Sequence, residues 1–367
     1  MKKQFLTIVM IAAFFLCLTA PNLLFPFLQT EADRENLENR SLAAFPTLSA
    51  DTLGSFPSSM EQYLGDHAAF RNRFLTLNSL LNLKLFGHAD STQVLKGKDG
   101  WYFYTAGASM ENYLGINPFS EPDLERIAAK VSQVQEALDA RGIQLVILLA
   151  PSKEGIYSEY LPDDFHPASA PTQREQLVTC LQERTSVPIV DPYPLLKNSR
   201  DEQWFYKTDT HWNDAGGFVA SQLLIETVGG TPTPLSQVNV SYVPREMGDL
   251  AKLFHMPEAY NEETQAVLSG YYDSLVTQFE DPDGNGNIVH LATDQSPDPR
   301  RIAVYRDSFG TALSPFLSKY FRQTDFYHWQ AYTPALIEEN PPDLLIYEVV
   351  EREEGRILDD MEKLLPR

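Results

Sequence analysis

The longest apolar run in the chain lies at its N-terminus. After Lys2 and Lys3, residues 4–28 carry no charged side chain and are rich in Phe, Leu, Ile and Ala. A helix that spans a bilayer needs about 17–25 such residues. We therefore predict that residues 1–28 form a single-pass signal-anchor in the cell membrane, with both lysines on the cytoplasmic side. A cleaved signal peptide, which would make the protein secreted, is the alternative. Both assignments place the remaining residues outside the cytoplasmic membrane.

A polar arm and a helix are predicted for residues 29–95. The residues up to Pro57 are mostly polar and contain spaced prolines, which favours an extended arm. Residues 59–87 then place apolar side chains at helical spacing, and Gly87 is suited to end the helix. The apolar positions are Tyr63, Leu64, Phe70, Phe74, Leu77, Leu80 and Leu81. A turn at residues 98–100 is predicted to lead into a short aromatic strand.

Strand and helix patterns alternate through most of residues 96–367. Several of the strands are continuous apolar runs, which is typical of strands buried on both faces. The predicted strands are residues 143–151, 187–191, 301–307, 325–329 and 343–352, and the predicted helices are residues 120–142, 173–185, 214–230, 308–321 and 355–366. The alternation predicts one α/β domain in which a parallel sheet lies between two layers of helices, a three-layer α/β/α sandwich.

The alternation breaks between residues 231 and 299, where Pro, Gly and Asp are frequent. Two hairpin-like stretches occur in this span, and we predict an irregular, β-rich insertion rather than a separate domain. Within it, residues 281–287 (DPDGNGN) resemble the beginning of a calcium-binding loop. The twelfth position of that loop, which requires a bidentate Glu, is Ala292. A hairpin turn is therefore the preferred interpretation.

The composition restricts the classes of function. Hydrophobic residues make up 43% of the chain, which is enough for a folded core. The formal net charge of −21 argues against nucleic acid as a partner, because phosphate binding depends on Lys and Arg that release counterions. Cys17 lies in the N-terminal apolar segment and Cys180 in the body, so no intrachain disulfide framework is expected outside the membrane. We interpret Cys180 as a core residue.

A serine stands at the end of one predicted buried strand. Ser308, in the segment VYRDSFG, follows the strand at residues 301–307 and precedes a predicted helix. Open α/β sheets place their chemistry at the carboxyl ends of the strands. Backbone N–H groups at a helix N-terminus also favour a developing oxyanion. Ser308 is therefore a candidate nucleophile that requires a base, with helix capping as the structural alternative.

The segment TDTHWNDAGG supplies a candidate base. In an extended segment, residues i and i+2 project to the same side, so Asp209 can reach a ring nitrogen of His211 and fix its tautomer. The other ring nitrogen is then free to take the proton of Ser308. The glycines at 216 and 217 are expected to let the backbone turn into the following helix.

Other interpretations of this segment remain open at this point. His211 can be an ordinary surface or core histidine, and Asp209 and His211 together can be metal ligands. His255 is then a weak candidate for a third ligand, and we predict neither a metal nor a cofactor. Trp212 is interpreted as a packing residue in preference to a substrate contact, and it stays among the candidate site residues.

Taken together, these motifs resemble a known family. The segments ENRSLAAFP, GKDGWYFY, APSKEGIYSEYLP, TDTHWNDAGG, RDSFG and PDLLIYEVVER, in this order, are similar to those of extracytoplasmic polysaccharide O-acetyltransferases of the alginate acetylation type and of the related bacterial DHHW proteins. The resemblance implies an SGNH hydrolase-like fold. It also implies that Asp209 and His211 match the family's Asp-x-His and Ser308 its nucleophile. Arg306 departs from the pattern, because a Gly usually precedes Asp-Ser in SGNH-like motifs.

The resemblance also implies a function. It predicts transfer of an acyl group through an acyl-enzyme to a cell-surface or exported polysaccharide, with a membrane O-acyltransferase as the partner that supplies acetyl groups. A carbohydrate acetyl-esterase with the same triad is one alternative, and an anchored, non-catalytic glycan-binding protein is another.

Five further residues are predicted to orient substrate or to support the triad: Lys153, Tyr206, Arg306, Asp307 and Arg352. Lys153 can instead pair with Glu154, and Arg352 with Glu351 or Glu353.

Overall fold

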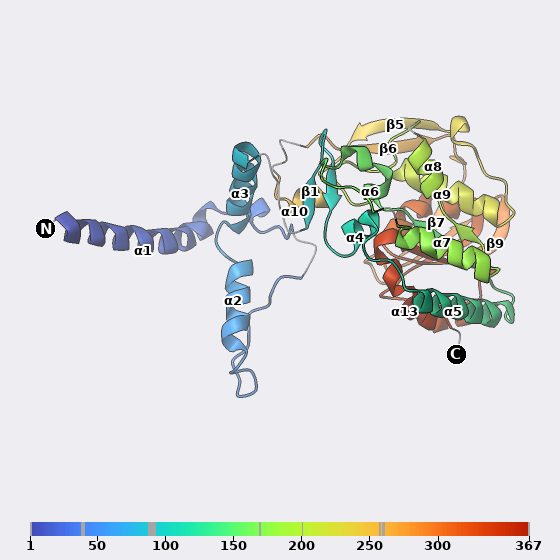
Figure 1. Ribbon diagram of the computed structural model, residues 1–367, viewed down its shortest axis with the longest axis horizontal. Helices are drawn as coiled ribbons and strands as arrows, with labels where there is room; N and C mark the ends of the chain where they lie inside the picture. The colour runs from blue at the N-terminus through green and yellow to red at the C-terminus, as the bar shows by residue number, and fades with distance from the viewer. Residues whose placement is uncertain are drawn as a thin grey trace. The chain divides into compact units, whose positions relative to one another are not determined.

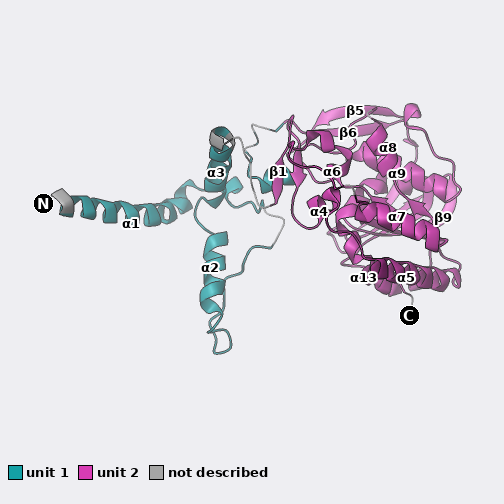
Figure 2. Ribbon diagram, in the orientation of Figure 1, with its two compact units in different colours: residues 1–91, 249–261 teal, residues 92–248, 262–367 magenta. Residues whose placement is uncertain are grey.

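A mostly parallel β-sheet organises residues 92–248 and 262–367, one of the two units into which the chain divides (Figure 2). The computed structural model describes residues 2–37, 41–86, 93–168, 170–199, 201–256, 258 and 261–365. Over these residues the sheet has seven strands in the order β4-β3-β11-β9-β10-β8-β7. Their bounds are β3 (Gln144–Ala150), β4 (Ile189–Val190), β7 (Thr277–Glu280), β8 (Ile288–Thr293), β9 (Asp298–Arg306), β10 (Phe321–His328) and β11 (Leu344–Val350).

The five strands from β4 to β10 run parallel, and β11 fills the place between β3 and β9. In the shared register, Leu344 of β11 pairs with Gln144 on one side and Ile302 on the other. The predicted α/β class with a parallel sheet is confirmed. The antiparallel strands β8 and β7 extend it beyond β10.

Alternate side chains along each strand fill two separate cores. On β3, Leu145, Ile147 and Leu149 face one core, while Val146, Leu148 and Ala150 face the other. The first core is covered by α5 (Glu121–Asp139), α7 (Gln173–Arg184) and α13 (Ile357–Leu364). The second is covered by α6 (Lys153–Ile156), α8 (Tyr193–Asn198), α9 (Asp214–Thr227) and α11 (Ser314–Tyr320) (Figure 1). Each fully buried aliphatic side chain contributes about 1.5–3 kcal/mol to the hydrophobic stabilisation.

The span 231–299 is not one insertion. Strands β5 (Asn239–Pro244) and β6 (Thr264–Ser269) form a separate antiparallel pair. Strands β7 and β8 form a hairpin that joins the main sheet beside β10, so residues 281–287 are the hairpin connection that we predicted. Residues 249–261, with α10 (Asp249–Leu253), group with residues 1–91.

The predicted helix at residues 59–87 is wrong in one respect. Two helices, α2 (Phe56–Asp66) and α3 (Arg71–Phe86), take its place, and Phe70 between them has a positive φ of 57°. The apolar spacing continued across the break and concealed it, although Gly65 stands in the last turn of α2. Gly87 lies outside the described residues.

A long apolar helix occupies the N-terminal segment. Helix α1 (Lys2–Leu28) contains a stretch, Gln4–Leu28, that is long and apolar enough to cross a membrane. The predicted turn at residues 98–100 is confirmed between β1 (Val94–Lys96) and β2 (Tyr102–Tyr104), where Asp99 and Gly100 both have positive φ.

Candidate active site

Three adjacent strands bring three of the predicted site residues to one edge of the sheet. Strands β3, β11 and β9 are neighbours and run parallel. Lys153, Arg352 and Ser308 follow their respective carboxyl ends. Because parallel strands all end on the same side, the edge that the sequence indicated is the edge where these residues lie.

The turn that carries Ser308 is held by the carboxylate of Asp307. One Asp307 oxygen accepts a hydrogen bond from the N–H of Phe309 at 2.8 Å, and the other accepts one from the N–H of Val350, also at 2.8 Å. These bonds tie the turn to the end of β11 and leave Ser308 exposed to solvent. The N–H of Phe309, which we expected to face an oxyanion, therefore already has an acceptor.

The segment that carries Asp209 and His211 is a tight loop and not the extended segment that we predicted. An isolated bridge between Phe205 and Trp212 closes it, and residues 207–211 form successive bends. Asp209 Oδ1 accepts a hydrogen bond from the backbone N–H of His211 at 3.1 Å and lies 2.7 Å from its Nδ1. The carboxylate of Asp209 thus meets the ring of His211 because it also accepts a hydrogen bond from the backbone two residues later, as in an Asx turn.

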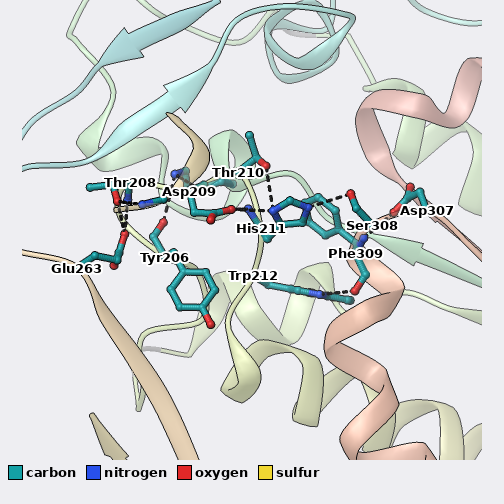
Figure 3. Close-up of polar contacts among 12 residues, drawn as sticks. Tyr206, Thr208, Asp209, Thr210, His211, Trp212, Glu263, Asp307, Ser308 and Phe309 are labelled. Carbon is teal, nitrogen blue, oxygen red and sulfur yellow. Dashed lines mark hydrogen bonds and ion pairs between the residues drawn. The ribbon is translucent and has the colours of Figure 1, made fainter. Parts of the chain in front are cut away.

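The loop and the serine turn meet through a row of hydrogen bonds. His211 Nε2 lies 2.8 Å from Ser308 Oγ, on the opposite side of the ring from Asp209 (Figure 3). Because a carboxylate only accepts hydrogen bonds, Nδ1 carries the proton that faces Asp209. In the neutral ring, Nε2 is then the acceptor for the hydroxyl proton of Ser308.

Trp212 connects the two segments. Its side chain is buried, and its Nε1 donates a hydrogen bond to the carbonyl of Phe309 at 2.9 Å (Figure 3). The ring of Phe309 also lies against those of His211 and Trp212, with centroids 5.0 and 5.7 Å away. The loop and the turn, 97 residues apart in sequence, are therefore held in register by packing as well as by the hydrogen bond of Ser308.

The two glycines in this region act differently from our expectation. Gly216 and Gly217 lie inside α9, whose N-cap is Asn213. A Cβ on Gly217 would come within 2.5 Å of the carbonyl oxygen of Ala312, and one on Gly216 within 2.6 Å of that of Trp204. The glycines allow α9 to approach both neighbouring segments closely.

The side chain of Lys153 holds the loop that carries Asp209 and His211. Its buried Nζ donates to the carbonyl oxygens of Tyr206 and Lys207, both at 3.2 Å, and to that of Asp209 at 2.6 Å. The alternative partner Glu154 instead accepts a hydrogen bond from the N–H of Tyr104. Lys153 is thus a positioning residue for the loop, since an ammonium group has three protons to donate.

Three acidic or basic residues that the sequence did not single out also support the site. Glu263 accepts hydrogen bonds from the N–H groups of Lys207 and Thr208 and from the hydroxyl of Thr208 (Figure 3). Glu348 accepts one from the N–H of Asp307. Arg245 places a guanidinium nitrogen 3.4 Å from Asp209 Oδ2. Two of the three lie in the span that we interpreted as an insertion, which concealed their role.

The charge on Asp209 is stabilised by its surroundings. Burial raises the pKa of Asp209, but the hydrogen bonds from His211 and the charges of His211 and Arg245 outweigh it, so that this pKa lies well below its usual range. The guanidinium of Arg245 also lies 3.8 Å above the ring of Tyr206. Burial, with the negative charge of Asp214, raises the pKa of Tyr206 to about 12, so its phenol stays neutral.

The two remaining candidates, Arg306 and Arg352, have different surroundings. Arg306 is buried, and its guanidinium donates to the carbonyls of Asp307 and Gly286. It therefore ties the serine turn to the connection between β7 and β8. Arg352 forms no ion pair or hydrogen bond with any residue that the structure describes. Its guanidinium lies over the rings of Tyr104 and Phe309, at 5.4 and 5.1 Å, next to the serine turn.

The contacts of His211 bear on the metal alternative. Both ring nitrogens already have partners, Asp209 and Ser308, so a metal would have to displace one of them.

The match to a known family places the protein among the SGNH hydrolase-like enzymes, a class of acyltransferases and esterases. Residues 94–285, more than half of the chain, match the family described as "SGNH hydrolase-like domain, acetyltransferase AlgX". The chain belongs to this family, which confirms the resemblance stated from the sequence motifs. The matched region contains Asp209 and His211 and ends before Ser308.

Individual relatives agree with the family. A probable alginate O-acetylase, AlgJ, of Pseudomonas fluorescens is 26% identical over 346 residues, which cover 85% of this chain and 82% of the relative. The corresponding protein of Pseudomonas aeruginosa is 25% identical over 330 residues, covering 82% and 80%.

Among solved structures, Bacillus cereus PatB1 aligns with a TM-score of 0.56 at 16% identity, over 74% of this chain and 99% of that one. A DHHW family protein from Eubacterium siraeum aligns with a TM-score of 0.52 at 16% identity, over 75% and 96%. These two likenesses show a shared fold.

Proposed function

We propose that the protein is an O-acetyltransferase that acts on a polysaccharide outside the cytoplasmic membrane, with Ser308, His211 and Asp209 as its catalytic triad. The observation that supports this proposal most directly is the row of two short hydrogen bonds, 2.7 and 2.8 Å, that ends on an exposed hydroxyl. The relatives that are probable alginate O-acetylases support the polysaccharide as acceptor.

In the first half-reaction, Ser308 Oγ attacks the carbonyl carbon of the acyl donor while His211 Nε2 takes the hydroxyl proton. Asp209 holds the ring in the required tautomer and stabilises the imidazolium. The donor's leaving group then departs with the proton from His211, which leaves an ester on Ser308. The guanidinium of Arg352 lies over the ring of Phe309, the residue after Ser308, and its positive charge favours the oxyanion that forms on the carbonyl oxygen.

In the second half-reaction, a sugar hydroxyl attacks the ester carbonyl as His211 removes its proton. The bond to Ser308 Oγ breaks, Oγ recovers the proton, and the acylated sugar leaves. Atoms and charges balance, and the enzyme returns to its starting state.

The supply of acyl groups follows from the proposed location. Helix α1 acts as a signal-anchor in this proposal, so the site lies where cytoplasmic acyl-CoA is absent. A membrane O-acyltransferase then delivers the acetyl group to Ser308 from the cytoplasmic side.

Mass spectrometry of the acylated protein tests this proposal. The full chain in detergent is treated with 4-nitrophenyl acetate and digested, and we expect one acetyl group on the peptide that contains Ser308. The Ser308→Ala variant should carry none on that peptide. Absence of the acetyl group from the Ser308 peptide of the wild type, or an equal amount of it on that peptide in Ser308→Ala, would overturn the triad. Acetate release with no transfer to added polysaccharide would identify an esterase.

A further inference from the structure

A cavity lies on the same unit as the candidate active site. Its volume is about 480 Å³, within the range of roughly 300–1,000 Å³ that is common for small-ligand sites. The turn between β1 and β2, the short helix η2 (Ser158–Tyr160), the loop at residues 201–207 and the β5–β6 pair all contribute to its lining.

Aromatic residues form one part of this lining. The ring of Trp101 stacks on those of Tyr157 and Tyr160, with centroids 4.2 and 5.0 Å away. Tyr242 also lines the cavity, and 40% of its surface is exposed. Its hydroxyl donates to Glu202 at 2.7 Å and accepts from the N–H of Gln203 at 3.1 Å, which fixes the ring. Trp101 and Tyr157 are buried, whereas Tyr160 and Tyr242 are partly exposed. Rigid, partly exposed rings such as these two pack well against the C–H faces of a pyranose.

Acidic residues form the polar part. Asp99, Asp201 and Glu202 line the cavity, whereas the one basic lining residue in the described part of the chain is Lys207, whose Nζ donates to the carbonyl of Asp99 at 3.3 Å. Carboxylates accept hydrogen bonds from hydroxyl and ammonium groups and repel other carboxylates. The lining therefore suits a sugar with hydroxyl or amino groups and disfavours a uronic acid.

The cavity and the candidate active site share one loop. Lys207 lines the cavity, its carbonyl accepts a hydrogen bond from Lys153, and Asp209 follows two residues later. A sugar in the cavity would thus rest on the backbone that positions the Asp209–His211 pair.

We propose that this cavity binds a glycan segment that carries hydroxyl or amino groups and no carboxylate. Its role as the acceptor subsite rests on the proposed function, but the binding itself does not. The acceptor is then a neutral or amino-sugar polymer, unlike the polyuronate alginate.

Calorimetric titration of the full-length Ser308→Ala variant in detergent tests the proposal without turnover. The probes are hexamers of glucosamine, of glucose and of mannuronate. We expect the first two to bind and mannuronate to bind at least about tenfold more weakly. Equal or tighter binding of mannuronate would overturn the proposal, as would the failure of both other hexamers to bind.

Paired variants locate the site. Tyr242→Ala should weaken binding of both glucosamine and glucose hexamers about tenfold, and Glu202→Gln should weaken glucosamine binding more than glucose binding. The matched controls, Phe279→Ala and Glu280→Gln on β7, are exposed and should change neither. Unchanged binding in Tyr242→Ala, or an equal loss in Phe279→Ala, would contradict the assignment.

The two proposals fail separately. Acetylation of Ser308 without glycan binding would remove the cavity's role and leave the triad intact. Glycan binding without acetylation of Ser308 would do the reverse.

Discussion

At the scale of single residues, the candidate site depends on side chains that each form hydrogen bonds with two or three other groups. Asp209 accepts from both the backbone and the ring of His211, and Lys153 donates to three carbonyls of one loop. Asp307 plays the same part for the serine turn. Removing one such side chain leaves several buried groups without partners at once.

Asp209→Asn should preserve the shape of the site and abolish most of the activity. An amide can present its N–H₂ group to Nδ1 and favour the wrong tautomer, so we expect the rate of Ser308 acetylation to fall about 10³–10⁴-fold. Stopped-flow measurement of nitrophenol release gives this rate. Asp164→Asn, at an exposed position, is the control and should retain the wild-type rate.

Lys153→Met should lower both stability and activity. The methionine fills a similar volume but removes the three hydrogen bonds of the ammonium group, for a loss of about 2–4 kcal/mol in the free energy of unfolding; the carbonyl of Lys207 keeps its bond from the N–H of Tyr102. Urea denaturation measures this loss, and the acetylation rate of the folded variant measures the displacement of the loop. Lys153→Arg should not restore the rate, because a planar guanidinium cannot reproduce the three bonds of an ammonium group. A variant with wild-type stability would contradict the positioning role.

At the scale of elements, the site is assembled by strand order and by close packing of α9. The ends of β3, β11 and β9 lie next to one another only because β11, the last strand in sequence, fits between the other two. Helix α9 follows directly after the Asp209–His211 loop, and Gly217 brings it against Ala312, four residues after Ser308. The distance between the imidazole and the hydroxyl is therefore set partly by a helix contact.

Gly217→Ala tests this contact. The added methyl group would lie 2.5 Å from the carbonyl oxygen of Ala312 and 2.8 Å from its Cβ, so backbone must move. A shift of about 1 Å at a reacting group can cost about 10²-fold in rate, and we expect a loss of roughly that size in Ser308 acetylation. Gly355→Ala, whose new Cβ would meet nothing within 4 Å, should leave the rate unchanged.

At the scale of the whole molecule, an acidic chain buries several carboxyl groups beside the sheet edge. Burial raises the pKa of Glu351 to about 7, with the charge of Arg174 opposing the shift. Burial, reinforced by neighbouring carboxylates, also raises the pKa values of Glu348 and Glu354 well above their usual range. Folding therefore favours the protonated form of these groups.

The stability of the sheet unit should fall as the pH rises. Between the ordinary pKa of 4.5 and the folded value of about 7, the folded state binds Glu351's proton more tightly than the unfolded state does. The stabilisation is thus complete below pH 4.5 and is lost by about pH 7, for a change of up to about 3 kcal/mol. Glu351→Gln should reduce this slope while keeping an acceptor for the N–H of Ser152.

Denaturation at pH 5 and pH 8, followed by tryptophan fluorescence, measures this effect. The chain has four tryptophans, at positions 101, 204, 212 and 329, and all lie in the sheet unit. A stability that rises over this interval in the wild type, or a slope unchanged in Glu351→Gln, would contradict the assignment.

Much of the fold was readable from sequence because it depends on local patterns. The apolar runs around Val146, Val304 and Ile346 predicted buried parallel strands, and the strand-end position of Ser308 pointed to the correct edge of the sheet. The hairpin at residues 281–287 was likewise evident from its turn residues. The break before Phe70 was missed although Gly65 stands in the last turn of α2, and the split of residues 231–299 was missed because strand pairing decides it and not local residue type.

The sequence by itself determined the elements, the Asp-x-His spacing and the acidic balance, because these follow from neighbouring residues. Only the tertiary structure decided that β11 lies between β3 and β9, that Lys153 bonds the loop rather than Glu154, and that Arg245 and Glu263 support it. Such contacts join segments tens to hundreds of residues apart. Which of these contacts form depends on how the whole chain packs, and the local pattern of residues does not determine that packing.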